Sequence, residues 1–401
     1  MELSFYTNFT NDLAQQESYL NTLQEEVSTG YAVTTSAQNP SAFETATLGT
    51  DQINALTSDT STQASITSQL GSVSDTYQSV STLLDSVQSV IEQALNATTS
   101  TTNLSALSTQ VTASMQELIG LGNATGGNGS YLFSGSRGSI APFQTNSSGN
   151  IVYMGDGGQS LAAISPDTTA ATLANGESFM TGLTGSGFGS ASAATANTGS
   201  GLLVSQGVTN PTAAAAFQSG GAAITLSFAE GTSGMTYTAT QGGTTLSTGA
   251  VTSGMSISLG GSDYKLSGTP AAGDSFTVAP SQPQSAFALL QSVAATLGSA
   301  GSSSASSAQT NQQLNEDLQT LAGYQQSVLT SQAQTGVTLQ AVTAAGTSDA
   351  AAETSASTLV QAAVGVNMPA AITALDDTLA SVEAAMKAFS SVESLSLFNY
   401  L

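Results

Sequence analysis

The sequence predicts a mainly α-helical protein with a β insertion: N- and C-terminal segments form a coiled-coil and helical rod, and the central segment forms an antiparallel β domain. Apolar residues near the start are spaced alternately by four and three, with Gln16 in one place: Phe9, Leu13, Leu20, Leu23 and Val27. The spacing returns near the end, at Ile372, Leu375, Leu379, Val382, Met386 and Phe389. Such spacing places the side chains on one side of a helix, where they need a second helix. The centre is rich in Gly, Ser and Thr and alternates as strands do.

Residues 1–40 are expected to form the first terminal-helix segment, in an inner coiled coil. Gly30 and the pair Asn39-Pro40 are stop and turn signals after it. A long helix is then expected from Ser41 to about Ala97, roughly 85 Å at 1.5 Å per residue. Its clearest apolar seam runs through Ile66, Leu70, Val73, Tyr77, Val80, Leu84, Val87 and Ile91. A helix of this length indicates a bundle.

Residues 41–160 are expected to complete the N-terminal part of the rod and add a β-hairpin. A second helix is predicted from Leu104 to about Leu121, and the glycines of GNATGGNG end it. The segments YLFSGS and NIVYMGD then alternate like two strands around a polar loop.

Residues 161–280 are expected to form a variable outer domain of small antiparallel sheets. Within it, Gly182–Gly201 has few bulky residues and is predicted to be a mobile loop. Six segments read as strands: AAITLSFA, MTYTAT, TTLSTGAV, MSISLGG, YKLSG and SFTVAP.

Residues 281–348 are expected to return to the rod as helix. Apolar spacing resumes at Phe287, and an Ala/Ser-rich break separates two helical runs. Residues 349–401 form the second terminal-helix segment, with a helix expected from Ala350 towards Ser391. The alternative for the two terminal seams is the ordinary core of a monomeric bundle.

Composition excludes several classes of function. The 26 acidic residues face three basic ones, Arg137, Lys265 and Lys387, and the net charge is −23. This charge repels phosphate groups, so neither nucleic acid nor an anionic membrane surface is an expected partner. Cysteine, histidine and tryptophan are absent, which excludes disulfides, a thiolate nucleophile, a histidine base and a Cys/His zinc site.

Export signals of the common kind are also missing. The N-terminus has no basic region followed by a continuous apolar core, so no cleavable signal peptide is predicted. No stretch approaches the ~18 apolar residues that a membrane span needs. We expect a chain without membrane insertion whose export, if any, leaves its N-terminus uncleaved.

Several motifs resemble parts of binding or catalytic sites, but each is better explained as a turn or a solvated helix face. We therefore expect no enzyme activity, cofactor or metal. The segment MGDGGQ lacks the carboxylate spacing of a calcium loop and reads as a turn. The pairs Glu25-Glu26 and Asp376-Asp377 lie on amphipathic helices, where solvated faces are expected rather than catalytic carboxylates. The glycine pairs fit hairpin turns rather than phosphate-binding loops: Gly220-Gly221, Gly242-Gly243 and Gly260-Gly261.

Four ordered motifs resemble the flagellin superfamily. LNTLQEEVSTGYAV followed by NPSAF is similar to its opening helix, although Tyr31 stands where a basic residue is usual. GNGSYLFSGSRGSIAPFQ with GNIVYMGD resembles a hairpin of its hook-associated proteins, and GDSFTVAPSQPQSAFALLQ resembles their return into the rod. The tail SLSLFNYL resembles that of hook-associated proteins at the hook–filament junction, with Asn399 in place of an acid. Residues 161–270 match nothing specific.

The resemblance implies a flagellin-like fold and a structural role in joining hook to filament. It implies export unfolded through the flagellar type III route, an extracellular place at the junction, and terminal helices that fold on assembly. Implied partners are further copies in a helical ring, the other hook-associated junction protein, flagellin and an export chaperone. The implied assembly interface comprises Leu13, Leu20, Leu23, Val27, Leu375, Leu379, Val382, Met386, Phe389, Leu395, Leu397, Phe398 and Leu401. We expect the α-helical seam residues to face each other across the two termini, and the tail to be buried against neighbouring subunits.

Two other functions remain open at this point. A flagellin-type filament subunit has the same fold, and the SLFNYL ending argues against it. A surface adhesin or glycan-binding module in Leu161–Pro280 is of a different class, and the few aromatic residues there argue against sugar stacking.

Overall fold

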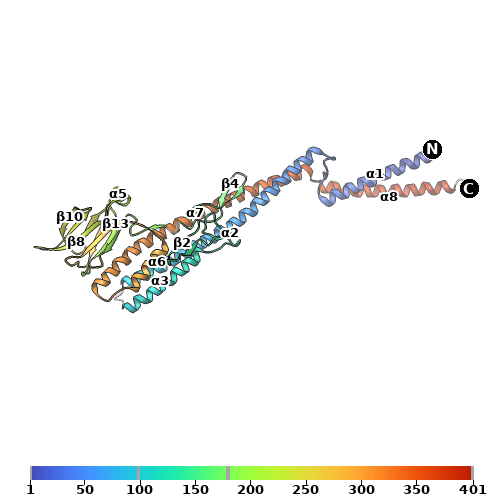
Figure 1. Ribbon diagram of the computed structural model, residues 1–401. Helices are drawn as coiled ribbons and strands as arrows, with labels where there is room; N and C mark the ends of the chain where they lie inside the picture. Colours follow the sequence, from blue (N-terminus) through green and yellow to red (C-terminus); the bar gives the residue numbers. More distant parts are fainter. Residues whose placement is uncertain (1, 97–99, 178–180, 399–401) are drawn as a thin grey trace. The chain divides into compact units, whose positions relative to one another are not determined.

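A computed structural model describes residues 2–96, 100–177 and 181–398 of the chain (Figure 1). The chain divides into two compact units. The first comprises Met1–Gln63, Ile164–Asp167 and Ala344–Leu401, and the second comprises Ala64–Ala163 and Thr168–Thr343. Two long helices, α2 (Pro40–Asn96) and α7 (Ser304–Val364), contribute to both units.

The first unit is built from paired helices. Helix α1 (Glu2–Thr29) packs against α8 (Met368–Phe398) in antiparallel fashion, so the start of α1 lies beside the end of α8 (Figure 1). The start of α2 lies close to the end of α7, since a Cβ on Gly49 would come within 2.5 Å of the Val360 side chain. The amide of Gln63 donates a hydrogen bond of 2.6 Å to the Asp349 carboxylate.

Two chain reversals are tied together in this unit. Gly30 ends α1 with a φ of +76°, in the left-handed region that glycine enters without steric cost. Tyr31 forms an antiparallel β-bridge with Gly365. The Ala32 amide donates to the Val364 carbonyl at 2.7 Å, and the Val366 amide donates to the Gly30 carbonyl at 3.0 Å.

The boundary between the last two helices differs from the prediction. A new helix was expected to begin near Ala350, whereas α7 continues to Val364 and α8 begins at Met368. Gly346 lies within α7, at a point of close packing where a Cβ would come within 3.0 Å of the Gln63 side chain.

The second unit contains the side-by-side helices that the sequence predicts. Helices α2, α3 (Thr101–Gly122), α6 (Ala286–Gly298) and α7 share one hydrophobic core. Each contributes side chains at helical spacing, and the largest fully buried ones include Tyr77, Phe287 and Tyr324. The expected packing of the three rod tracts is confirmed within this unit.

Short strands follow α3, and one of the two predicted strands is wrong. The hairpin consists of β1 (Phe143–Thr145) and β2 (Ile151–Tyr153), whereas YLFSGS forms turns. Four consecutive residues of that segment, 132–135, are buried, so the alternation that a half-buried strand requires is absent. Two further strands are β3 (Leu161–Ser165) and β4 (Thr168–Ala171).

We call residues 182–280 the β domain. Its five-stranded sheet has the order β10-β9-β8-β13-β6 and its three-stranded sheet the order β11-β12-β7, with every pairing antiparallel. The six predicted strands correspond to β8 (Ile224–Gly231), β9 (Gly234–Gln241), β10 (Thr244–Ala250), β11 (Ser256–Leu259), β12 (Ser262–Ser267) and β13 (Ser275–Pro280). The antiparallel β insertion is therefore confirmed.

Several elements of the β domain were missed. The expected loop Gly182–Gly201 contains β5 (Gly182–Leu183), which pairs with β14 (Pro283–Gln284), and β6 (Gly189–Ala193). Strand β7 (Leu202–Val208) and helix α5 (Pro211–Gly220) complete the domain. Gly242-Gly243 and Gly260-Gly261 have positive φ in hairpin turns, as expected, but Gly220-Gly221 ends α5 instead.

Candidate assembly interface

Helix α1 presents one apolar face to α8. Leu23 is buried, and Leu13, Leu20 and Val27 are half-buried at the predicted spacing. At the far end of the pair, the Phe9 ring stacks on Phe389 at a centroid distance of 4.4 Å. The Tyr6 ring meets the same Phe389 edge-on at 5.5 Å. Residues from the two chain ends thus share one contact face, as the spacing predicts.

Helix α8 departs from the predicted pairing. Leu375, Val382 and Phe389 are half-buried, whereas Leu379 and Met386 remain 42% and 56% exposed. The pairing of these last two with α1 is therefore not what the structure shows. A single neighbouring helix covers only one side of the seam, and the small side chains of Ala371, Ala374, Thr378 and Ala385 take the adjacent covered positions.

The uncovered residues of α8 form a stripe of their own. Met368 and Ile372 are 38% and 44% exposed, and they continue the line of Leu379 and Met386 at spacings of four and seven. We call these four residues the outer stripe. Four large apolar side chains in line on one exposed helix side are typical of a surface that binds another helix.

A polar residue sits within the α1 seam. Gln16 occupies the place that an apolar residue would take between Leu13 and Leu20. Its Oε1 atom is buried and has no hydrogen-bond partner among the described residues. An unpaired amide in a helical seam lowers stability and can fix the register of pairing.

The residues of the predicted tail contacts have side chains outside the described part of the chain. Leu395, Leu397 and Phe398 lie in α8, but their side chains are outside the described residues, as is Leu401 altogether. Their role in assembly stays a prediction.

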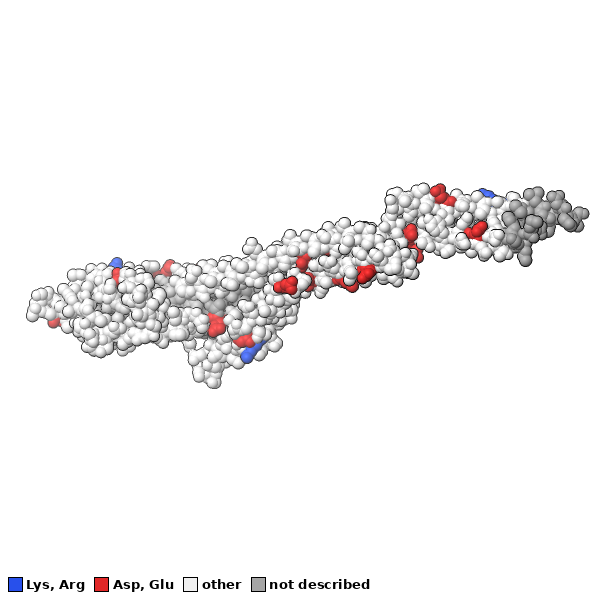
Figure 2. All heavy atoms as spheres, turned by 90° about the horizontal axis from the view of Figure 1, so that it is seen from above, with Lys and Arg blue, Asp and Glu red and all other residues white. Residues whose placement is uncertain are grey.

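The carboxylate pairs on these helices are on solvated faces. Glu25, Asp376 and Asp377 are exposed, and Glu26 is half-buried. Figure 2 shows acidic side chains scattered singly or in small groups, with large uncharged areas between them. Among the described residues, no cluster of three or more acidic side chains has a geometry that could hold a metal ion.

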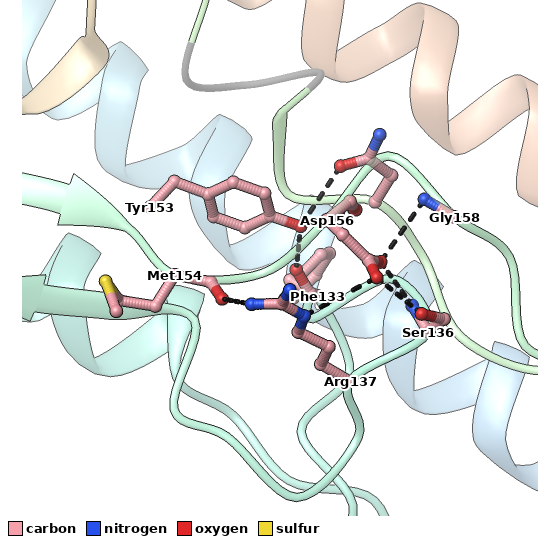
Figure 3. A network of polar contacts seen from close by, with 8 residues as sticks. Phe133, Ser136, Arg137, Tyr153, Met154, Asp156 and Gly158 are labelled. Carbon is pink, nitrogen blue, oxygen red and sulfur yellow. Dashed lines mark hydrogen bonds and ion pairs between the residues drawn. The ribbon is translucent and has the colours of Figure 1, made fainter.

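The MGDGGQ segment is a hydrogen-bonded turn. The Asp156 carboxylate accepts hydrogen bonds from the Ser136 amide at 2.7 Å, the Gly158 amide at 3.2 Å and the Ser136 hydroxyl, and lies 3.7 Å from the Arg137 guanidinium (Figure 3). The two bonds from Ser136 contribute most to holding the pKa of Asp156 below its ordinary value. Tyr153 donates to the Phe133 carbonyl at 2.9 Å beside it. The segment anchors the hairpin, and its carboxylate is already satisfied by these donors.

Comparison with known proteins bears on this architecture. Residues 2–137 match the family described as the bacterial flagellin N-terminal helical region. The resemblance to the flagellin superfamily is confirmed over these N-terminal residues. No curated protein sequence matches the chain significantly.

Several solved structures share the fold of this chain over most of its length. A crystal structure of Xanthomonas campestris FlgL is 27% identical, covers 72% of this chain and 92% of its own, and has a TM-score of 0.62. The flagellar junction protein FlgL from Legionella pneumophila is 22% identical, covers 80% of this chain and 100% of its own, and has a TM-score of 0.71. A structure titled flagellar hook associated protein-3, from the same organism, is 23% identical, covers 86% and 99%, and has a TM-score of 0.67.

The described helices are not of the membrane-spanning kind. None of them combines the length and the apolar character needed to cross a bilayer.

Proposed function

We propose that this chain is a structural subunit of the bacterial flagellum that joins the hook to the filament, the role of the third hook-associated protein. The observation that carries the proposal is the fold, because this chain aligns with 92% and 100% of the length of two structures named FlgL. In addition, its residues 2–137 match the flagellin N-terminal helical region. The tail motif SLSLFNYL favours the junction over the filament.

The terminal helices are the proposed assembly interface. The α1/α8 pair is held by few buried side chains, such as Leu23, and by half-buried ones, and it leaves the outer stripe uncovered. A pair of helices with so little core is marginal by itself and gains stability from further helices. Terminal helices that complete their packing only against neighbouring subunits would couple folding to assembly.

The proposed partners follow from that role. They are further copies of the chain in a helical ring, the other hook-associated junction protein on the hook side, flagellin on the filament side and a flagellar export chaperone. The chain would leave the cell unfolded through the flagellar export route, without signal cleavage, and reside outside the cell at the junction. A sequence free of cysteine suits such a route, because no disulfide can form wrongly on the way.

A clean deletion tests the role. We expect cells with intact hooks that shed filament protein into the medium, and restoration of filaments by the wild-type gene. Complementation with Leu379→Asp plus Met386→Asp should fail. A matched control is Leu246→Asp, since Leu246 is 49% exposed but lies on β10 in the β domain. Full-length filaments in the deletion strain would rule out the junction role.

The filament-subunit alternative is separated by copy number. A junction subunit is present in a few copies per flagellum, and a filament subunit is present along its whole length. Quantitative mass spectrometry of purified flagella distinguishes the two, and an abundance equal to that of flagellin would favour the alternative.

The adhesin alternative finds little support in the β domain. Sugar-binding sites rely on exposed aromatic faces. The aromatic side chains Phe217, Phe228, Tyr264 and Phe276 are buried, and Phe188 and Tyr237 are half-buried. A glycan array with the full chain should be negative.

A further inference from the structure

A row of polar side chains on α7 holds the β domain. Gln309, Gln312, Glu316 and Thr320 are spaced by three and four residues and so share one side of the helix. Gln312 is 1% exposed, and its amide nitrogen donates to the carbonyls of Ala191 at 3.1 Å and Leu203 at 2.8 Å. The docking of the domain on α7 therefore depends on buried hydrogen bonds.

Backbone amides of the β domain complete this row. The Leu203 amide donates to Gln312 Oε1 at 2.8 Å, and the Gly185 amide donates to Thr320 Oγ1 at 2.8 Å. Both bonds join the domain to α7 rather than strand to strand. They report directly on whether the domain is docked.

Glu316 lies in the middle of the row. Its side chain is 4% exposed, and the Ser190 hydroxyl donates to its Oε2 at 3.1 Å. Its Oε1 is buried and has no hydrogen-bond partner among the described residues. The backbone approaches closely here, since a Cβ on Gly185 would lie 2.7 Å from Oε2. The Ala191 backbone also hydrogen-bonds to this carboxyl. An ionised carboxylate needs more donors than these when it is buried, and one oxygen here is left bare, which favours the neutral acid.

Among the described residues, no positively charged side chain acts on Glu316. Strand β6 contributes Ser190 and no titratable side chain, β12 contributes Tyr264, and α7 contributes the neighbouring Asp317. Burial raises the pKa of Glu316 to about 7, with Asp317 adding to the rise and the Ser190 and Ala191 hydrogen bonds opposing it. Burial also raises the pKa of Tyr264, so this phenol stays neutral across the range in question.

We propose that the Glu316 carboxyl is a pH-sensitive latch, which holds the β domain against α7 when neutral and loosens that docking when ionised. The latch goes beyond the junction role proposed above and does not rest on it. It makes the docking of the β domain, rather than the packing of the terminal helices, depend on the pH of the surroundings.

The direction of the pH effect follows from linkage. The pKa of Glu316 is raised from an ordinary value of 4.5 to about 7 in the docked state. Undocking exposes the carboxyl and releases its proton at any pH between these values. The equilibrium constant for docking of the β domain on α7 is therefore greatest below about pH 4.5. It falls by up to roughly 300-fold as the pH rises, and levels off above about pH 7.

Residue-resolved hydrogen exchange on the full chain tests the latch. Protection factors, corrected for intrinsic exchange, should fall with pH for the Gly185 and Leu203 amides. They should hold steady for Leu226 and Ala239, which face each other in the β8–β9 ladder. Glu316→Gln should abolish the pH dependence at Gly185 and Leu203. Equal loss at all four amides would overturn the proposal, because the sheet itself would then be unfolding.

Two further variants keep the test decisive. Ser190→Ala removes a donor that lowers the pKa of Glu316, so the upper end of the transition should move to higher pH. Asp317→Asn is the matched control: it removes the adjacent buried carboxyl, which faces Ser292 of α6 rather than the β domain. The control should retain the pH dependence at Gly185 and Leu203, with its upper end at somewhat lower pH, because Asp317 contributes to the raised pKa of Glu316. A transition that survives Glu316→Gln, or one that Asp317→Asn abolishes, would assign the effect to another group.

Discussion

The same four-and-three spacing of apolar residues has two different outcomes in the two units. In the second unit, the α2 seam residues Val73, Val87 and Ile91 are fully buried. In the first unit, Leu379 and Met386 of α8 keep about half of their surface exposed. The difference lies in the number of neighbours, since α2 packs with α3, α6 and α7 in the core of the second unit, whereas α8 packs against α1. A sequence seam shows that a helix needs partners, and the number of partners decides whether the seam is core or interface.

The largest effect on stability is expected in the core of the second unit. Leu290 of α6 is fully buried among the four helices. Leu290→Ala should lower the free energy of unfolding by about 2–5 kcal/mol, because it removes buried methyl groups and leaves a cavity. Chemical denaturation followed by circular dichroism measures this. A loss below about 1 kcal/mol would mean that this seam is packed no better than that of α8.

The stability of the same core should depend on pH through the buried carboxyl group of Asp317. Burial raises the pKa of Asp317 to about 7, against opposing hydrogen bonds from Gln313 and Ser292. The unfolded state releases this proton from about pH 3.8 upward, so the contribution of Asp317 to stability is most favourable below that pH and declines up to about pH 7. The decline is on the order of 4 kcal/mol.

Asp317→Asn isolates that contribution. The variant should be less sensitive to pH between 4 and 7 than the wild type in denaturation experiments. Asp376→Asn is a suitable control, since Asp376 is exposed on α8 and lies outside the second unit. Identical profiles for wild type and Asp317→Asn would show that the buried carboxyl is not protonated in the folded state.

Elements were predictable from the sequence where their apolar side chains recur at a regular spacing. The α2 seam and strands β8–β13 were predictable, because spacings of 3.6 and 2 residues are written directly in the order of apolar side chains. Helix α5 was missed although its signals are present: Asn210 caps it by accepting from the Ala213 amide, and Pro211 opens it. Strand β6 was missed because its residues Gly-Ser-Ala-Ser-Ala are too small to show alternation.

The sequence did not predict which elements pack against α8 and α7. The exposed state of Leu379 and Met386 depends on how many helices surround α8, which the chain order does not state. The row around Glu316 looks like a solvated helix face in the sequence and becomes buried only because β6 and β7 lie on it. The sequence carries no signal that polar residues on a helix are buried, so only the structure identifies the surface of α7 on which the β domain docks.

A smaller effect is expected inside the α1/α8 pair. Phe389 is half-buried and contacts the rings of Tyr6 and Phe9. Phe389→Leu keeps an apolar side chain and should lower the protection of nearby α1 amides by the equivalent of about 0.5–1.5 kcal/mol, the worth of such ring contacts. Hydrogen exchange measures it, and amides of α3 in the second unit serve as the internal reference. Equal loss in α3 would show that the terminal pair and the second unit unfold together.

The smallest effect on the free chain, and the most informative one, is expected at the outer stripe. Leu379 and Met386 are exposed, so Leu379→Asp plus Met386→Asp should change the free energy of unfolding of the free chain by no more than about 0.5 kcal/mol per site. If the stripe packs against a neighbouring subunit, the same carboxylates would be buried there, at a cost of several kcal/mol unless they are protonated. Assembly should therefore fail while thermal unfolding of the chain stays unchanged, and sedimentation of assembled junctions together with calorimetry measures both. A double variant that unfolds more easily yet still assembles would make the α8 seam ordinary core, and the contrast between the two units would then be one of degree only.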